Sequence, residues 1–84
     1  MRIKHKIGDV VRVEWEDSWT NYTKIYDLAD INAEEPFVGR AIGEIVRNDK
    51  TGITLAHESF LGRFRMVHHI PRSLIRKVKN FGPV

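Results

Sequence analysis

The stretch HHIPRSLIRKV, residues 68–78, contains the corner on which the predicted fold depends. Pro71 has no backbone N–H to donate, so a strand that reaches it must stop there. The segment PRSL (71–74) has the length of one 3₁₀ turn with a proline at its start. A final strand, IRKVKNF (75–81), then resumes, so the corner carries the chain from one sheet to the other. The apolar residues that flank the corner are expected to be buried: Ile70, Leu74 and either Ile75 or Val78.

Upstream of the corner, alternation of apolar and polar residues predicts strands that bury one face. IGDVVRVEWEDS (7–18) alternates most clearly, and its inward residues are Val11, Val13 and Trp15. GITLAHES (52–59) has two inward residues, Ile53 and Leu55. In FLGRFRMVHHI (60–70), Gly62 marks a turn. The residues on the inner side of the strand that follows this turn are Phe64, Met66, His68 and Ile70.

Two connections complete the pattern. FVGRAIGEIVRND (37–49) predicts a strand in which Gly39 and Gly43 indicate a bulge or sharp coiling. A hairpin turn follows it, with Asn48, Asp49 and Gly52 as its turn residues. The long first connection, WTNYTKIYDLADINAEEP (19–36), predicts either a short marginal helix or an ordered loop with one helical turn.

These elements together predict an all-β fold. Five short strands, a long first connection and a 3₁₀ turn before the last strand are typical of a small SH3-like barrel. We expect residues 1–84 to form one domain, because the chain is short.

Composition excludes several classes of function. The chain has no cysteine, so it has neither disulfides nor a thiolate nucleophile nor a Cys-based zinc site. No apolar run approaches the ~20 residues of a membrane span. The start, MRIKHKIGDV, lacks the apolar segment of a signal peptide. We therefore expect a soluble, cytoplasmic protein that does not act at a membrane.

Charge is distributed unevenly along the chain, although the net charge is only +3. From Glu14 to Glu35 there are seven acidic residues and one lysine, Lys24. From Leu61 to the end there are six basic residues and no acid. If the N- and C-terminal strands lie side by side, they make one basic face. A solvated surface that keeps a small barrel soluble is the alternative interpretation.

The order of the motifs resembles a family of small phage- and prophage-encoded proteins with an SH3-like barrel. The family pattern is a hydrophobic-x-W-x-D-S strand, an S-V-G-containing strand, a charged turn with I-x-L-A, and a terminal I-P-x-x-x-I. The matched positions are Val13, Trp15, Asp17, Ser18, Gly39 or Gly43, Asp49, Ile53, Leu55, Ala56, Ile70, Pro71 and Ile75. VGRAIG (38–43) departs from the pattern, because it lacks Ser-Val-Gly and the following aromatic residue. The resemblance implies an accessory protein that binds a host component or signal molecule in the host cytoplasm.

Two groups of residues are candidate binding sites. Aromatic and polar residues gather in the first connection, where they can stack on a ring or fix polarity: Asp17, Ser18, Trp19, Tyr22 and Tyr26. The alternative is that Trp19 and Tyr22 only cover the open end of the barrel. The second group consists of arginines whose guanidinium forks match phosphate oxygens: Arg63, Arg65, Arg72 and Arg76. We expect Arg72 and Arg76 to point to solvent and to converge on one anion with Arg63 or Arg65.

Catalysis, metal binding and cofactors are not expected. His68 and His69 are adjacent, so on a strand their side chains face opposite ways. A site built from His57, one of this pair and a carboxylate is conceivable, but lone histidines are more often hydrogen-bonding partners. Ser18 lies beside Asp17 without a nearby histidine or a glycine elbow, so no nucleophile is indicated.

The sequence therefore predicts a non-enzymatic binding protein, with a counter-defence or host-takeover role implied by the resemblance. Its expected partner is a host protein or a small anionic, nucleotide-like signal. The alternative is a nucleic-acid-binding regulator, supported by the basic last third of the chain and opposed by the acidic first connection. We also expect self-association, because the strand at 37–46 is apolar on both faces.

Overall fold

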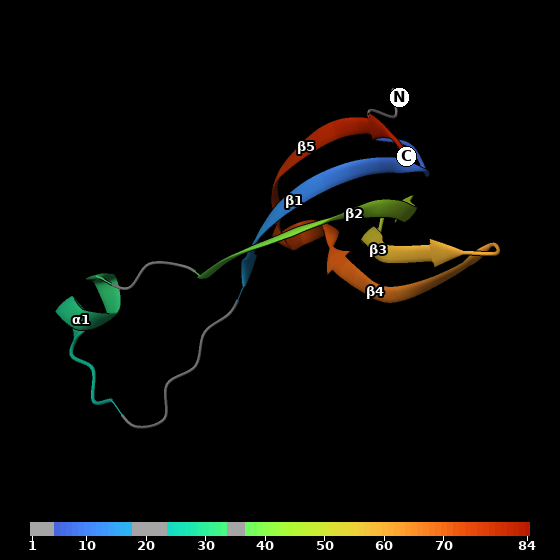
Figure 1. Cartoon of the computed structure of the whole chain (residues 1–84). Helices are drawn as coiled ribbons and strands as arrows, with labels where there is room; N and C mark the ends of the chain where they lie inside the picture. The colour runs from blue at the N-terminus through green and yellow to red at the C-terminus, as the bar shows by residue number, and fades with distance from the viewer. Residues whose placement is uncertain (1–4, 18–23, 34–36) are drawn as a thin grey trace.

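The computed structural model describes residues 5–17, 24–33 and 37–84. Its strands, a short helix and a 3₁₀ turn follow one another along the chain (Figure 1). In chain order they are β1 Asp9–Asp17, α1 Leu28–Ala33, β2 Phe37–Asp49, β3 Gly52–Phe60, β4 Arg63–Pro71, η1 Arg72–Leu74 and β5 Ile75–Pro83. The expected all-β fold, with five strands and a 3₁₀ turn before the last strand, is confirmed. Of the two forms expected for the first connection, the structure has the short helix.

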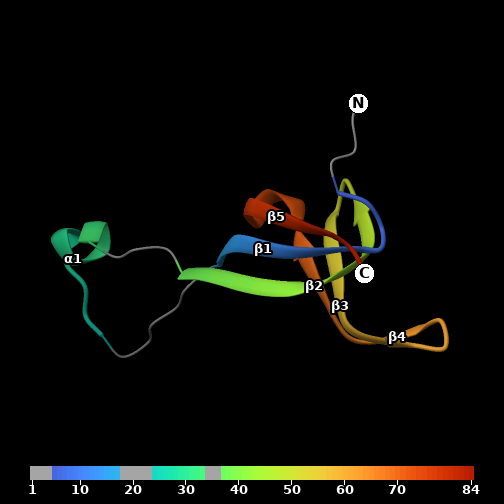
Figure 2. The ribbon, with the colours of Figure 1, turned by 45° about the horizontal axis from the view of Figure 1, so that its top comes forward.

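All neighbouring strands pair antiparallel in one sheet, in the order β4-β3-β2-β1-β5. The sheet curves strongly, and β4 and β5 form its two edges (Figures 1 and 2). No strand pairing joins these edges within the part of the chain that the structure describes. The sheet is therefore not closed into the complete barrel that we expected.

The corner at residues 70–75 is formed as predicted and rests against the β2–β3 turn. Ile70 is buried, and the backbone N–H of Arg72 donates to the carbonyl of Thr51 at 3.0 Å. Gly52 lies so close to this corner that an added Cβ would come 2.1 Å from the Ile70 carbonyl oxygen. Its φ of +148° is also one that L side chains rarely adopt. Glycine is therefore required at position 52 both for space and for backbone conformation.

The core is small and lies on the concave side of the curved sheet. Six apolar side chains are fully buried: Val11, Val13, Ile45, Ile53, Leu55 and Ile70. Four more are partly buried against them: Trp15, Ala41, Ile75 and Val78. The inward residues predicted for residues 7–18 and 52–59 are thus confirmed. Leu74 is an exception, because η1 directs it outward and leaves it 37% exposed.

The two glycines of β2 allow close packing, whereas the register shift of this strand lies elsewhere. An added Cβ on Gly39 would come 2.3 Å from the indole of Trp15, so the indole lies directly over the glycine. At Gly43 an added Cβ would meet the Ala56 carbonyl at 2.8 Å. The shift in β2–β3 pairing occurs between Ile45 and Arg47. The predicted bulge therefore exists in this strand, but beyond the glycines.

Half of the β3–β4 hairpin extends beyond the rest of the sheet. Pairing between β2 and β3 begins at Asp49–Gly52 and ends at Glu44–Ala56, whereas β3 and β4 stay paired as far as Phe60 and Arg63. We call this two-stranded extension, residues 57–67, the ribbon. All of its residues are exposed. The prediction that Phe64 and Met66 point into the core is wrong, because in the described strand pairing no third strand joins β3 and β4 along this part of the hairpin.

Among the described residues, none of the helices has the length and apolar character that a membrane crossing needs.

Candidate binding surface

The structure describes only part of the predicted aromatic and polar group in the first connection. Asp17 ends β1 and is exposed. Tyr26 is half-buried, and the Lys24 ammonium group lies 4.7 Å from the centre of its ring. Ser18, Trp19 and Tyr22 lie outside the described residues. The group as a whole therefore stays a prediction.

The four predicted arginines do not form one cluster. Arg63 and Arg65 lie on the ribbon, and Arg65 pairs with Glu58 at 3.3 Å while its guanidinium lies 5.4 Å from the ring centre of Phe60. Arg72 lies just beyond the opposite end of β4, on the order of 25 Å away along the strand. Arg76 lies on β5 and pairs with Glu16 at 3.4 Å. A single anion cannot contact all four guanidinium groups.

Arg72 is part of the scaffold. Its guanidinium donates to the side-chain oxygen of Asn48 and to the carbonyl oxygens of Asp49, at 2.7 Å, and Gly52, at 3.4 Å. These acceptors all belong to the β2–β3 turn. Arg72 is exposed, as expected, but the turn acceptors that the corner brings close hold its guanidinium, and its role in ligand binding stays a prediction.

A different group of cations does converge, on the outer face of β2, β1 and β5. Strand pairing places Arg40 and Lys77 on either side of Glu14, and it places Lys79 beside Arg12. The Arg40 Nε donates to the Glu14 carboxylate at 2.9 Å. We call the four cations of this surface the basic face: Arg12, Arg40, Lys77 and Lys79.

The electrostatics of the basic face are visible at Glu14, the carboxylate that lies among its cations. The hydrogen bond from Arg40 lowers the pKa of Glu14, and the charges of Arg40, Lys77 and Arg12 lower it further. Glu14 therefore stays ionised and offsets one of the four positive charges. Because three adjacent strands hold these side chains in register, the remaining positive charge has a fixed position on the sheet.

The sequence contained part of the evidence for the basic face. A basic face is expected from the sequence if the terminal strands lie side by side, and the pairing of β1 with β5 meets this condition by bringing Arg12 next to Lys79. Arg40 was missed, because its approach to Glu14 depends on the register between β1 and β2. Alternation alone does not reveal that register.

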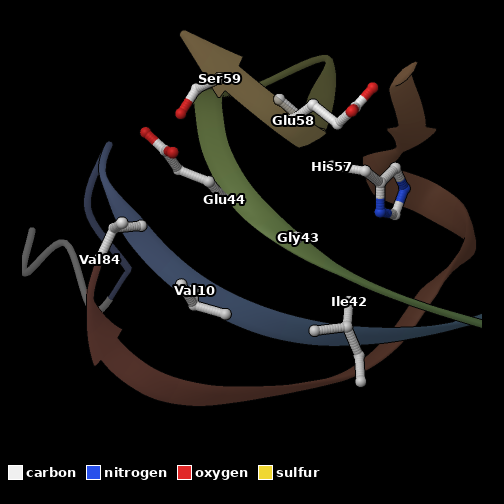
Figure 3. Close-up of a pocket in the computed structure, with 9 residues that line it drawn as sticks. Val10, Ile42, Gly43, Glu44, His57, Glu58, Ser59 and Val84 are labelled. Atoms are coloured by element: carbon white, nitrogen blue, oxygen red, sulfur yellow. The ribbon is translucent and has the colours of Figure 1, made fainter. Parts of the chain in front are cut away.

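An open groove of about 320 Å³ lies where β3 diverges from β2. Its apolar lining consists of Val10, Ile42, Ala56 and Val84. Figure 3 shows the polar side chains around it: Glu44 and Ser59 lie toward one end, and His57 lies at the other. Among the described residues no hydrogen bond joins these three side chains to one another.

The histidines of the opening motif have partners within the sheet. The His68 ring stands edge-on to the indole of Trp15, with 5.2 Å between ring centres. The ring nitrogen Nδ1 of His69 lies 2.7 Å from the Thr54 hydroxyl. Across the ranges that the structure describes, no three His, Asp or Glu side chains gather in a way that would hold a metal ion.

Comparison with known proteins gives no further guide to the ligand of these surfaces. No family model matches the chain, and no curated protein and no solved structure was found to match it.

Proposed function

We propose that the chain is a non-enzymatic binding protein that holds an anionic partner on the basic face. The observation that carries the proposal is the convergence of Arg12, Arg40 and Lys77 on Glu14 across three paired strands. A carboxylate with three cations around it leaves an excess of positive charge at a fixed place. Such a surface attracts negative groups and orients them during encounter.

The shape of this surface favours an extended partner. None of the four basic-face cations lines the groove between β2 and β3. Small ligands generally need a concave site that buries most of their surface. We therefore propose the acidic surface of a host protein as the partner, in the counter-defence or host-takeover role that the resemblance to phage accessory proteins implies. A small anionic signal is the other ligand to be tested on the same face.

A second candidate, binding of single-stranded nucleic acid, is favoured by one aromatic residue. Phe81 is 53% exposed, and the Lys79 ammonium group lies 5.6 Å from its ring centre. An exposed ring at the end of a basic surface is the arrangement on which an unpaired base stacks while its phosphate meets a cation.

The test compares a basic-face variant with a matched control. The double substitution Lys77→Glu and Lys79→Glu removes half of the basic face. The control, Lys6→Glu and Lys50→Glu, changes the net charge equally at exposed lysines elsewhere. Each protein is titrated with single- and double-stranded oligonucleotides and with a panel of cyclic nucleotides, and tagged versions are used to capture partners from host lysate.

We expect the basic-face variant to lose at least tenfold in affinity for the ligand that the wild type binds, and the control to bind normally. For a nucleic acid, the salt dependence should also become shallower by roughly one unit of log–log slope per cation removed. Phe81→Ala should weaken single-stranded binding only. Equal binding by the wild type and the basic-face variant would show that the ligand is held elsewhere.

A further inference from the structure

The first connection contains a short arm whose apolar side chains are exposed. We define the arm as residues 24–33, which include α1. None of the α1 side chains is buried. The turn is stabilised locally instead: the Asp27 carboxylate accepts from the Asp30 amide at 2.8 Å, and the Asp30 carboxylate accepts from the Asp27 amide at 3.3 Å. These reciprocal bonds have the pattern of a capping box.

Three large apolar side chains of the arm are exposed. Ile25 is 93% exposed, Leu28 79% and Ile31 47%. Leu28 and Ile31 are three residues apart in α1 and lie along one side of it, and Ile25 comes three residues before the helix begins. An isolated helix of six residues is not stable in water on local bonds alone. The arm therefore needs an apolar surface to cover this side.

The ribbon is a second surface with exposed apolar side chains. Whereas the net charge of the arm is negative, that of the ribbon is positive. Its exposed apolar residues are Phe60, Leu61, Phe64, Met66 and Val67. Arg63 and Arg65 lie among them, and Glu58 pairs only with Arg65. Within the described part of the chain Arg63 has no ion-pair partner. An apolar surface with net positive charge is left open on the ribbon.

The charges that line the two surfaces indicate that the acidic arm fits the ribbon better than the groove. The arm carries Asp27 and Asp30, and Glu34 and Glu35 follow it in the sequence. The groove is lined by the acid Glu44, which would repel these residues, and by Glu58, whose charge Arg65 offsets. The ribbon arginines would attract them, and its apolar side chains match Ile25, Leu28 and Ile31.

The arm and the ribbon of one chain lie at opposite ends of the molecule, whose longest dimension is 52 Å (Figures 1 and 2). The contact must therefore form between copies. We propose that the arm of one copy docks on the ribbon of a second copy, and that two copies exchange arms across a two-fold axis. When two such chains lie side by side and antiparallel, each arm reaches the other ribbon, so both contacts form in one closed dimer.

This inference assigns the expected self-association to a surface different from the predicted one. Within the strand at 37–46, Ile45 is buried in the core, whereas Ile42 lies on the outer face beside Arg12. The proposal is also independent of the basic face, because neither the arm nor the ribbon contains Arg12, Arg40, Lys77 or Lys79.

Sedimentation velocity of the full chain, from about 1 to 300 μM, tests the proposal. We expect a concentration-dependent dimer. The arm variant Leu28→Ser and the ribbon variant Phe64→Ser should each weaken dimerisation about tenfold or more, since each removes one large apolar side chain from both contacts. Ile7→Ser is the matched control, because Ile7 is 70% exposed but lies in neither surface. Circular dichroism and urea unfolding confirm that each variant folds.

Mixing the two variants separates arm exchange from other dimers. A mixed dimer retains one intact contact, between the arm of the Phe64→Ser chain and the ribbon of the Leu28→Ser chain. We expect the mixture to associate more strongly than either variant alone. A symmetric contact of arm with arm, or of ribbon with ribbon, would be insensitive to one of the two variants and would overturn the proposal. A wild-type chain that stays monomeric at 300 μM would overturn it as well.

Charge reversal provides an independent readout. Arg63→Glu should weaken the dimer, because it removes a positive charge from the ribbon and adds a negative one opposite the acidic arm. Lys50→Glu, an equal change of charge on the β2–β3 turn, should have no effect. If Arg63→Glu and Lys50→Glu weaken the dimer equally, net charge rather than the arm–ribbon contact controls association, and the proposal is wrong.

Discussion

Single residues at the corner show how an apparently functional motif becomes scaffold. Four basic side chains and two histidines in HHIPRSLIRKVK resemble a ligand site. In the fold, Arg72 binds the β2–β3 turn, His68 packs on Trp15, and His69 lies within hydrogen-bond distance of Thr54. Each of these contacts joins β4 or η1 to a different part of the sheet. Most of the motif therefore stabilises the crossing, and only Lys77 and Lys79 at its end contribute to the basic face.

Replacement of Arg72 by alanine should destabilise the protein. The variant loses the bonds to Asn48, Asp49 and Gly52, and we expect a loss of about 1–2 kcal/mol. Arg76→Ala is the control, because its ion pair with Glu16 is exposed and should contribute less than about 1 kcal/mol. Urea unfolding monitored by tryptophan fluorescence measures both. Equal effects of the two substitutions would contradict the scaffold role of Arg72.

Asp49 should make the stability of the fold depend on acid pH. The Thr51 hydroxyl, the Arg47 guanidinium and the Thr51 amide donate to its carboxylate, and they hold its pKa well below the usual range. A lowered pKa in the folded state means that the contribution is complete above the unfolded pKa, about 3.9, and is lost as pH falls below it.

Urea midpoints measured between pH 2 and 7 test this effect. We expect the Asp49→Asn variant to lose less stability than the wild type as pH falls below about 4, because the amide does not titrate. Above about pH 5, the urea midpoints of the two proteins should change with pH in parallel. A wild-type profile with the same acid slope as the variant would show that Asp49 is not responsible.

At the scale of elements, the β3–β4 hairpin depends on a backbone conformation that its sequence does not favour. Leu61 and Gly62 form the turn between the strands, with φ of 51° and 70°. Positive φ at both central residues is typical of a type I′ turn, for which Asn-Gly is the preferred pair. Leu61 is 92% exposed, so no burial compensates for its conformation within one chain. In the arm-exchange dimer, this side chain would become part of the docking surface.

Leu61→Asn should therefore stabilise the isolated chain by up to about 1 kcal/mol, since asparagine adopts the left-handed region more readily than leucine. The measurement is urea unfolding at low micromolar concentration, where self-association is weakest. Leu74→Asn serves as control, because η1 requires no positive φ, and no gain is expected there. A loss of stability on Leu61→Asn would mean that Leu61 contacts another part of the protein.

At the scale of the whole molecule, the fold rests on few buried side chains. Only six large apolar residues of the described chain are fully buried, whereas the arm and the ribbon extend away from them. The radius of gyration is 16.2 Å, compared with roughly 12 Å for a compact chain of this length. A small core and a large exposed apolar surface together favour a protein that gains stability by association.

Ile70→Ala should nearly abolish folding at low concentration. Ile70 is 1% exposed in the centre of the core, and its truncation should cost on the order of 2–5 kcal/mol. That loss is comparable with the whole stability expected of a small domain. Leu74→Ala, four residues away and 37% exposed, should cost less than about 1 kcal/mol. Thermal unfolding followed by circular dichroism distinguishes the two, and similar melting temperatures would contradict this account.

The sequence by itself determined the strands, the corner and most of the core. Val11, Val13, Ile53 and Leu55 were assigned correctly, because alternation is a local property that a strand must follow. Pro71 ended β4 for an equally local reason, its missing N–H. The uneven distribution of charge was also visible in the sequence, although it left open whether the terminal strands lie side by side.

Only the tertiary structure decided which residues face one another across strands, and which strands lack a partner. The distance from Arg72 to the β2–β3 turn, the approach of Arg40 to Glu14 and the exposure of Phe64 and Met66 follow from register and from where pairing between β2 and β3 ends. Those features depend on which of many possible strand registers has the lowest free energy. Alternation within one strand does not distinguish these registers, because it is the same in each of them. For that reason the arginines predicted as one site were separated, and the cations of the basic face were brought together.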